Sequence, residues 1–562
     1  IFIVFIHLVA TTIKILLPFL LGIWIALGLS IGCPTETGGN RIVFTATRLF
    51  LPVLMSMSAA TILTGIKGNT GRAGYITGFL IYVCLGYLLA SVRQSPIPEL
   101  PATTYMGYIQ APPVPQKSSW RFPLVLIASR TGDNWTAQDG RVMMVVSAKG
   151  PGWIDEEAPK TEFSHTGDGI PSEGNLIIFK GYCRPIPPEG AHPYERNLLR
   201  RHITHQVYLT QGQWKLLRTN CLKGVRRQAV LAREKILEVL RKEGLAGREL
   251  GITAAMILGY KAALDQETRA LFADSGTAHL LAISGMHTGI IFLMVSGGLR
   301  ILGRKPAAQT IRTILLLGFL WFFACMTGLA PSVVRASAML SLGLLSYGMQ
   351  RPCPLWQPWA ASALLLTALQ PEMLFDIGFQ MSYMAVGALL MYLRVPAFRR
   401  HSERSGWRQR RDGRCISRGI QEVLRLLRVS VAAQAGTAPL TLHYFGQFPV
   451  WFAITNLVAV PLASCIIFAS VIFLILHPIP LAGLWAAQGL KWLVQLLLGV
   501  TEWSSSLPWA TIQNIVLPPE QVVCFYLVLG GTGGWYQTRD VRYLYGLLAT
   551  GCLWLLSYPA YP

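Results

Sequence analysis

Residues 278–299 read AHLLAISGMHTGIIFLMVSGGL and contain no Asp, Glu, Lys or Arg. A helix of about 20 residues crosses the hydrocarbon layer of a bilayer, so this run predicts a transmembrane helix. Its first half nevertheless carries four polar side chains, those of His279, Ser284, His287 and Thr288. Ser284 and His287 are neighbours on one helix face, and polar groups at this depth face protein or water rather than lipid. Gly285 and Gly289 are spaced so that another helix, or a substrate, can approach the backbone closely.

The composition is that of an integral membrane protein that also carries a soluble part. Of the 562 residues, 52% are hydrophobic and 14% are charged, whereas a globular enzyme has about one quarter charged residues. The formal charge of +22 suits a polyanion or an anionic membrane surface, although Lys and Arg that anchor cytoplasmic loops explain part of it. The ten cysteines include no C-x-x-C pair, so no zinc ribbon or thioredoxin-like site is recognisable.

The N-terminal region, residues 1–94, is predicted to hold three membrane helices. Apolar runs of sufficient length lie at about 15–31, 42–66 and 73–92. A tight basic turn at 67–72 separates the last two runs, and basic loops stay in the cytoplasm. The segment after Val92 is therefore expected outside the cytoplasm.

Residues 95–224 form a predicted exterior domain that is rich in β-strands. Runs of strand length, separated by Gly, Pro and Asp, occur at 105–109, 120–127, 140–146, 175–181 and 206–209. About five short strands suit a small barrel of the OB type, and an open sheet is the alternative. Such barrels often bind single-stranded nucleic acid by stacking bases on aromatic side chains in a basic groove. Residues that could do so here are Trp120, Arg121, Tyr182 and Arg184, although aromatic residues of this kind also occur in protein cores.

Cys183 and Cys221 are the two cysteines of this exterior region, where an oxidising compartment permits a disulfide. Their separation along the chain does not show that they meet in space, so the bond is a hypothesis.

Residues 225–277 are predicted to be amphipathic or interfacial helices. Between 226 and 243, apolar residues alternate with Arg, Lys and Glu at helical spacing. This pattern indicates a helix that lies on the membrane or packs beside the membrane-spanning part. The next apolar segment, 251–261, is too short to be a clear span.

The region 278–562 is predicted to cross the membrane several times. Further spans are expected at about 313–330, 333–349, 357–370, 374–393, 482–501, 521–537 and 541–558. If the chain crosses the membrane at each of these spans, three basic segments lie on the same side as the turn at 67–72. They are the basic residues after 299, Arg351 and the basic loop 394–428. The positive-inside rule requires this agreement.

Polar residues interrupt these later segments. The stretch 327–335 breaks and restarts a helix, with Ser332 near its N-terminus and Arg335 in its first turn, and Asp376 and Gln380 lie four apart on one helix face. A helix cap or an interfacial Arg would explain them without any function. If both face a water-filled interior, Arg335 and Asp376 could instead pair.

Two further apolar segments, 433–446 and 455–463, combine an amide with a proline. The amides are Gln434 and Asn456, and the prolines are Pro439 and Pro461. Pro-interrupted helices with amide side chains occur where membrane proteins open a polar path. Proline also commonly kinks membrane helices without any further role. These two segments could therefore either line a polar path or simply be kinked helices.

Several stretches resemble the ComEC family of bacterial competence proteins. The matching segments are, in chain order, 187–202, 279–289, 327–335, 376–383, 433–446 and 455–463. The resemblance implies a polytopic α-helical membrane protein with an inserted exterior β-rich, OB-like domain, located as a multi-pass protein in the bacterial cytoplasmic membrane. The function that it implies is the translocation of single-stranded DNA through that membrane during natural transformation.

The resemblance also implies sites and partners. Polar and small side chains would line the DNA path, namely His279, Ser284, Gly285, His287, Gly289, Ser332, Arg335, Asp376, Gln380, Gln434 and Asn456. Outside, DNA would meet Trp120, Arg121, Tyr182, Arg184, Arg200 and Arg201. Expected partners are single-stranded DNA, DNA-receptor and pilus proteins outside, a cytoplasmic ATPase or helicase with single-strand-binding proteins, and the lipid bilayer. Many family members end in a metallo-β-lactamase-like domain, and we expect this chain to lack it because its H-x-H-x-D-H pattern is absent.

No G-x-x-x-x-G-K-[ST] or H-E-x-x-H motif occurs, so we expect no cofactor, no metal and no enzymatic activity. Two other functions stay open. The sequence Ala282-Ile-Ser-Gly285 weakly resembles the G-x-S-G of rhomboid intramembrane serine proteases, with His443 or His477 as the base. The chain could also transport another anion.

Overall fold

The computed structural model describes residues 104–116, 119–132, 134–147, 172–187, 193–210, 213–219, 221–303, 305–349, 353–394, 415–515 and 517–556, together with a few isolated positions before residue 104. The three membrane helices predicted within residues 1–94 lie outside the described residues. So do Arg351 and residues 395–414 of the predicted basic loop. The part of that loop from Cys415 onward is helical, because the long helix α15 (Cys415–Phe445) begins there.

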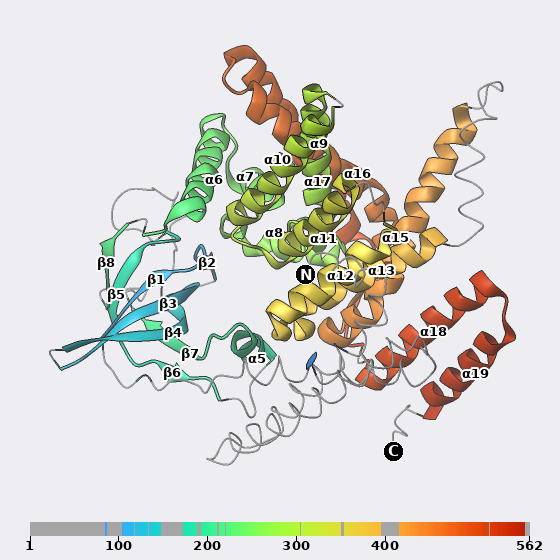
Figure 1. The fold of residues 1–562 in the computed structure, drawn as a ribbon, viewed down its shortest axis with the longest axis horizontal. Helices are drawn as coiled ribbons and strands as arrows, with labels where there is room; N and C mark the ends of the chain where they lie inside the picture. The colour runs from blue at the N-terminus through green and yellow to red at the C-terminus, as the bar shows by residue number, and fades with distance from the viewer. Residues whose placement is uncertain are drawn as a thin grey trace.

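An eight-stranded sheet precedes the helices in the described part of the chain (Figure 1). Its strands are β1 (Thr104–Ile109), β2 (Val114–Pro115), β3 (Ser119–Thr131), β4 (Asn134–Ser147), β5 (Leu176–Lys180), β6 (Arg184–Pro185), β7 (His205–Leu209) and β8 (Trp214–Arg218), and helix α5 (Pro193–Arg200) lies between β6 and β7. The five predicted strands are thus confirmed. The spatial order is β6-β7-β4-β3-β1-β5-β8, with β2 beside β3. The β4–β7 pair is parallel, and the other pairs are antiparallel.

Alternating side chains of these strands fill a single core. Every second residue of β1 is buried, which directs Tyr105 and Ile109 inward. The Tyr105 hydroxyl donates a hydrogen bond of 2.7 Å to the Leu100 carbonyl inside this core. At the end of β5, a Cβ on Gly181 would lie 2.7 Å from the Leu209 side chain of β7. The sheet therefore curls, because β5 and β7 meet although the strand order separates them.

Helices form the rest of the described chain. They are α6 (Gly224–Lys242), α7 (Gly247–Leu258), η1 (Lys261–Ala263), α8 (Gln266–Asp274), η2 (Ala278–Leu280), α9 (Gly285–Gly298), η3 (Leu299–Leu302), α10 (Pro306–Met326), α11 (Pro331–Gly348), α12 (Trp356–Leu369), η4 (Pro371–Phe375), α13 (Ile377–Arg394), α15 (Cys415–Phe445), α16 (Phe452–Leu476), α17 (Pro480–Ser506), α18 (Pro519–Thr538) and α19 (Val541–Leu556). A short pair of strands, β9 (Phe448–Pro449) and β10 (Thr511–Ile512), joins the segment before α16 to the segment after α17.

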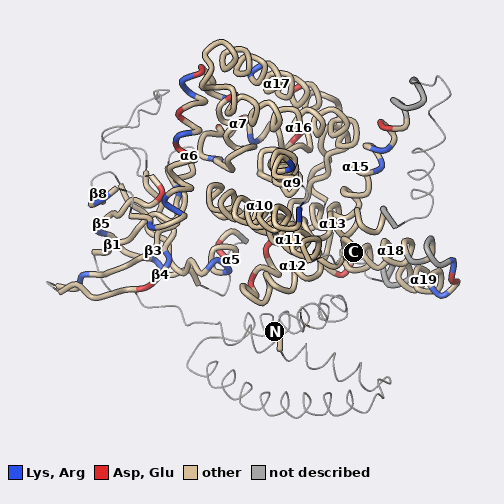
Figure 2. The backbone as a smooth tube through the Cα atoms, turned by 45° about the horizontal axis from the view of Figure 1, so that its top comes forward, with Lys and Arg blue, Asp and Glu red and all other residues tan. Residues whose placement is uncertain are grey.

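Four of the described helical segments are long and apolar enough to cross a membrane. They are Gly285–Leu302, Pro306–Met326, Phe452–Leu476 and Pro480–Ser506. Charged residues gather instead on the sheet, on α5 and on α6 (Figure 2). The fold is thus mostly helical, with a β-rich region before the helices.

Helix α7 lies in the middle of the largest apolar cluster. All its residues from Gly251 to Leu258 are buried, against Ala459 and Ile466 of α16 and Leu490 of α17, among others. An apolar helix of about 10–14 residues is more often a core helix than a span, and α7 is one. The preceding amphipathic helix is confirmed as α6, which packs its apolar face against α10.

The prediction of one continuous helix over 278–299 is wrong. Helix α9 begins at Gly285, and residues 278–280 form the separate turn η2. The break arises because Ser284 caps α9: its Oγ accepts the His287 backbone N–H, while the His287 Nδ1 accepts the Ser284 N–H, each at 3.3 Å. The expected interruptions at Pro439 and Pro461 do not occur either, since α15 and α16 continue through their prolines.

Candidate functional site: a polar junction at the starts of α9, α11 and α13

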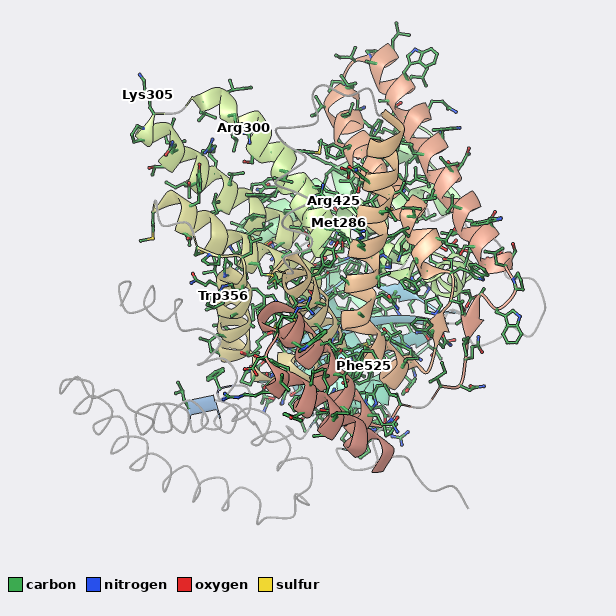
Figure 3. The ribbon with its side chains drawn as sticks, turned by 90° about the vertical axis from the view of Figure 1, so that its right-hand side faces the viewer. Met286, Arg300, Lys305, Trp356, Arg425 and Phe525 are labelled. Carbon is green, nitrogen blue, oxygen red and sulfur yellow. The ribbon has the colours of Figure 1, made fainter. Side chains whose placement is uncertain are left out.

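The start of α9 lies in the middle of the helical part of the molecule. Figure 3 shows Met286, at the start of α9, near the middle of the view, whereas Arg300 and Lys305, beyond the other end of α9, lie at the periphery. Next to Met286, His287 is fully buried, and its Nε2 has no hydrogen-bond partner among the described residues. Because its Nδ1 accepts a backbone N–H, the ring proton is on Nε2. The interior therefore contains a polar donor at the point where the helix begins.

Helix α11 is bonded to this starting point. The Ser332 hydroxyl, in the first turn of α11, donates a hydrogen bond to the carbonyl of Ile283. Gly285 also approaches α11, since a Cβ there would lie 3.6 Å from the Cβ of Ala336. Gly289 has open space instead, so the predicted close helix contact exists at Gly285 and not at Gly289.

One turn further along α11, Arg335 reaches the start of α13. Its Nη1 lies 3.8 Å from the Asp376 Oδ2, and the Arg335 side chain is almost completely buried. The same Oδ2 accepts the Phe379 backbone N–H at 2.8 Å. Asp376 is therefore both the N-cap of α13 and the counter-charge of Arg335, so the pairing and the cap that we considered as alternatives occur together.

Gln380 extends this polar group towards α15. Its Nε2 donates to the Leu374 carbonyl at 2.9 Å, and its Oε1 accepts from the Tyr444 hydroxyl at 2.9 Å. Residues from three separate sequence motifs thus meet around the start of α13. We call Ser284, His287, Ser332, Arg335, Asp376, Gln380 and Tyr444 the polar junction.

The β-rich region contacts the molecule at this same place. Arg200, at the end of α5, donates from Nη1 to the Phe375 carbonyl at 3.0 Å, and its guanidinium lies 5.2 Å from the centre of the Phe375 ring. His202 Nε2 lies 3.6 Å from a carboxylate oxygen of Glu372. Burial lowers the pKa of the Arg200 guanidinium, an effect that Tyr444 and Asp376 oppose. Arg200 therefore connects the β-rich region to η4, and its role as an exterior DNA-binding residue stays a prediction.

Two predicted polar path residues, Gln434 and Asn456, do not join the polar junction. His279, on η2 before the cap of α9, lies near enough to interact electrostatically with His287. Gln434 is ten residues before Tyr444 on α15, which is about 15 Å along a helix. Asn456, on α16, has a buried Oδ1 without a hydrogen-bond partner among the described residues.

The predicted exterior residues differ in their surroundings. Trp120 packs against the core of the sheet, and the Arg121 guanidinium lies 5.5 Å from the centre of the Tyr194 ring. Tyr182 is 76% exposed, and Arg184 and Arg201 are exposed as well. Tyr208, which the sequence analysis did not select, is also exposed. It shares a face of β6 and β7 with Arg184, which pairs with Gln206.

The predicted disulfide is not present, since Cys183 and Cys221 are both free thiols. Cys183 belongs to the core of the sheet, where burial raises the pKa of its thiol to about 12. The local sequence contained no signal of this burial, because residue 183 follows the last predicted strand of that segment.

The bases proposed for a serine protease are engaged elsewhere. His443 Nδ1 contacts the Leu517 carbonyl at 2.8 Å, and His477 Nδ1 lies 3.5 Å from a carboxylate oxygen of Glu243. The Ser284 hydroxyl caps α9. Within the described ranges, no group of three His, Cys, Asp or Glu side chains could hold a metal ion.

A second buried charge group was missed by the sequence analysis. Glu173, before β5, lies 3.1 Å from Arg226 and 2.8 Å from Arg233, both on α6. The Arg233 guanidinium also lies 5.7 Å from the centre of the Tyr260 ring, just after α7. The buried Arg within an amphipathic helix was the available signal, but its partner is 60 residues away.

Together, the four long apolar helices, the polar junction and the attached sheet define the class of a membrane protein with a β-rich region beside its helices. Residues 256–539 match the family described as Competence protein, and the chain belongs to this family, which confirms the resemblance to ComEC proteins.

Individual relatives are distant. The chain is 28% identical over 278 residues to ComE operon protein 3 of Bacillus subtilis. This match covers 48% of this chain and 31% of that protein. It is 26% identical over 248 residues to Recombination protein 2 of Haemophilus influenzae, and this match covers 43% of this chain and 30% of that protein. An uncharacterized protein of Aquifex aeolicus is 28% identical over 338 residues, and this match covers 60% of this chain and 71% of that protein. The chain thus matches about a third of the length of the two named relatives. No solved structure matches it.

Proposed function

We propose that the protein translocates single-stranded DNA across the bacterial cytoplasmic membrane during natural transformation. One observation carries the proposal: motifs that are far apart in sequence converge on the polar junction, in which His287 and Arg335 are buried, next to the point where the β-rich domain attaches. Polar groups of this kind are costly inside a membrane and occur mainly where a polar substrate passes.

The β-rich domain, which we assign to residues 95–224, would receive DNA outside as an OB-like barrel. The successive strands β1, β3 and β4, the pairing of β5 with β1, and the parallel addition of β7 to β4 support this assignment. Tyr182, Arg184 and Tyr208 supply the exposed aromatic and basic groups on which single strands stack.

Orientation follows from the basic residues. Arg300 and Lys305, at the periphery beyond α9, would lie in the cytoplasm by the positive-inside rule. Single-stranded DNA would then pass from the exterior domain, by the polar junction, towards that end. Receptor and pilus proteins outside and an ATPase inside would be the partners, as the family resemblance implies.

The decisive experiment is the uptake of end-labelled duplex DNA by cells that lack the protein, with surface-bound label separated from nuclease-protected label. We expect bound label to persist and protected label to disappear, and complementation to restore it. Complementation with Gln380→Leu, which removes both hydrogen bonds of Gln380, is expected to restore less protected label than the exposed-site control Glu238→Gln at equal protein level. An unchanged protected pool in the deletion strain would refute the proposal and favour transport of another anion.

A further inference from the structure

Three cationic residues lie in the region where the sheet contacts the first helices. Arg201 directly follows α5, Lys261 begins η1 and Arg269 lies on α8. The Arg269 Nη2 donates to the Lys261 carbonyl at 2.7 Å, which holds the two cations together. Strand β2 contacts η1, so the sheet lies against this turn. A fourth cation, Arg141 of β4, donates to the Arg201 carbonyl at 3.4 Å. We call Arg201, Lys261 and Arg269 the cation cluster.

Within the described part of the chain, the cation cluster has no carboxylate partner at ion-pair distance. Asp265 attracts Arg269, but its Oδ2 caps α8 at the Thr268 N–H and lies 3.9 Å from Arg248. Like charges that gather in this way are unfavourable unless an anion joins them.

Lys261 is an exposed member of the cation cluster. The pKa of its ammonium group is lowered, first by partial burial and then by repulsion from Arg269 and Arg201. The three charges therefore lie close enough to repel one another, and a solute can reach Lys261.

The cation cluster also adjoins the polar junction. Arg201 is next in sequence to Arg200, which bonds the carbonyl of Phe375 immediately before Asp376. Figure 2 shows basic residues on α5 at the side of the sheet that faces the helices. A strand that leaves the β-rich domain here would reach the polar junction next.

We propose that Arg201, Lys261 and Arg269 bind the phosphates of single-stranded DNA at the transfer from the β-rich domain to the helices, an inference that rests on the proposed function. Guanidinium groups bind phosphate with paired hydrogen bonds, and an ammonium adds a mobile point charge. Single-stranded DNA and a lipid headgroup both present a phosphodiester to such a site. We assign the DNA strand as the ligand because the cation cluster lies between the β-rich domain and the polar junction, the two parts that we propose contact DNA.

The test is the salt dependence of binding of a fluorescent oligothymidylate to the full chain in phosphatidylcholine nanodiscs. For single strands, each phosphate contact contributes about 0.7 to the magnitude of the slope of log K against log salt. One such contact therefore makes binding about fivefold tighter at ~0.1 M salt than at ~1 M salt. Lys261→Gln and Arg201→Gln are each expected to lower the slope by about 0.7. Lys242→Gln is the matched control, because Lys242 already pairs with Glu238 at 2.7 Å.

An unchanged slope in both variants, with an unchanged melting temperature, would overturn the inference. A lipid headgroup is the other phosphodiester source. If the variants lose bound phosphatidylglycerol in native mass spectrometry but keep the DNA slope, the cation cluster is a lipid site and the inference fails. Either result leaves the uptake experiment valid, whereas wild-type protein that binds no oligothymidylate would contradict the proposed function itself.

Discussion

Glu173 is predicted to hold the β-rich domain to the helices. Its carboxylate lies 2.8 Å from Arg233 and 3.1 Å from Arg226, and the exposed side-chain fractions are 1% for Glu173, 5% for Arg233 and 33% for Arg226. The substitution Glu173→Gln keeps the shape and removes the charge. Arg233 then stays buried without a counter-charge, and its Nε already lacks a partner among the described residues.

The expected cost follows from these burials. Breaking a buried pair by removing one partner costs about 3–5 kcal/mol. The contact with Arg226 is screened because that side chain is a third exposed, so we expect the lower end, about 3 kcal/mol. At about 1.4 kcal/mol per tenfold change, local opening of this joint becomes about a hundredfold more frequent.

Hydrogen exchange of the α6 amides measures this opening directly. We expect the amides of α6 peptides to exchange about a hundredfold faster in Glu173→Gln, because a loss of about 3 kcal/mol makes local opening that much more frequent. The control Glu238→Gln removes an exposed carboxylate of the same helix and is expected to leave exchange unchanged. Adding Arg233→Met to Glu173→Gln removes the unpaired buried charge and is expected to restore much of the protection. Unchanged exchange in Glu173→Gln would refute the reasoning, because it would mean that the buried charge is solvated without Glu173.

Three further predictions concern separate sites. Asp376→Ala is expected to lower thermal stability by about 1 kcal/mol more than Asp376→Asn, because Asn keeps the cap on Phe379 and both lose the charge; equal melting temperatures would contradict a role of the cap. In the folded protein a maleimide is expected to label Cys221 and not Cys183, because burial raises the pKa of the Cys183 thiol to about 12, which single Cys→Ser variants and labelling stoichiometry test. Burial lowers the pKa of His205 from its ordinary 6.5, so the unfolded chain binds the proton more readily, and stability is full above pH 6.5 and falls below it. Melting temperatures across that range are expected to show this loss, and His205→Gln to reduce it.

The two charged groups of the structure differ in how far the sequence revealed them. Arg335 and Asp376 stood in recognisable motifs, and their pairing was a stated hypothesis. Glu173 stood in no motif, and its partners Arg226 and Arg233 are 53 and 60 residues away. A long-range contact leaves no local pattern, so only packing shows it.

Local patterns explain what the sequence by itself determined. Short apolar runs, alternating with polar residues, predicted five of the eight strands of the sheet, and long apolar runs predicted helices such as α10 and α17. These features depend on side-chain periodicity within a few residues, which is written in the sequence. The order of the motifs likewise sufficed to indicate the family.

Tertiary structure decided the remainder. The helix expected over 278–299 begins only at Gly285, because His287 completes an unusual capping box whose hydrogen bonds depend on the conformation before α9. Arg200 contacts Phe375, which is 175 residues away, and Cys183 is buried in the sheet core instead of bonding to Cys221. Each outcome depends on which surfaces meet when distant segments pack, and that energy is not contained in any single stretch of the chain.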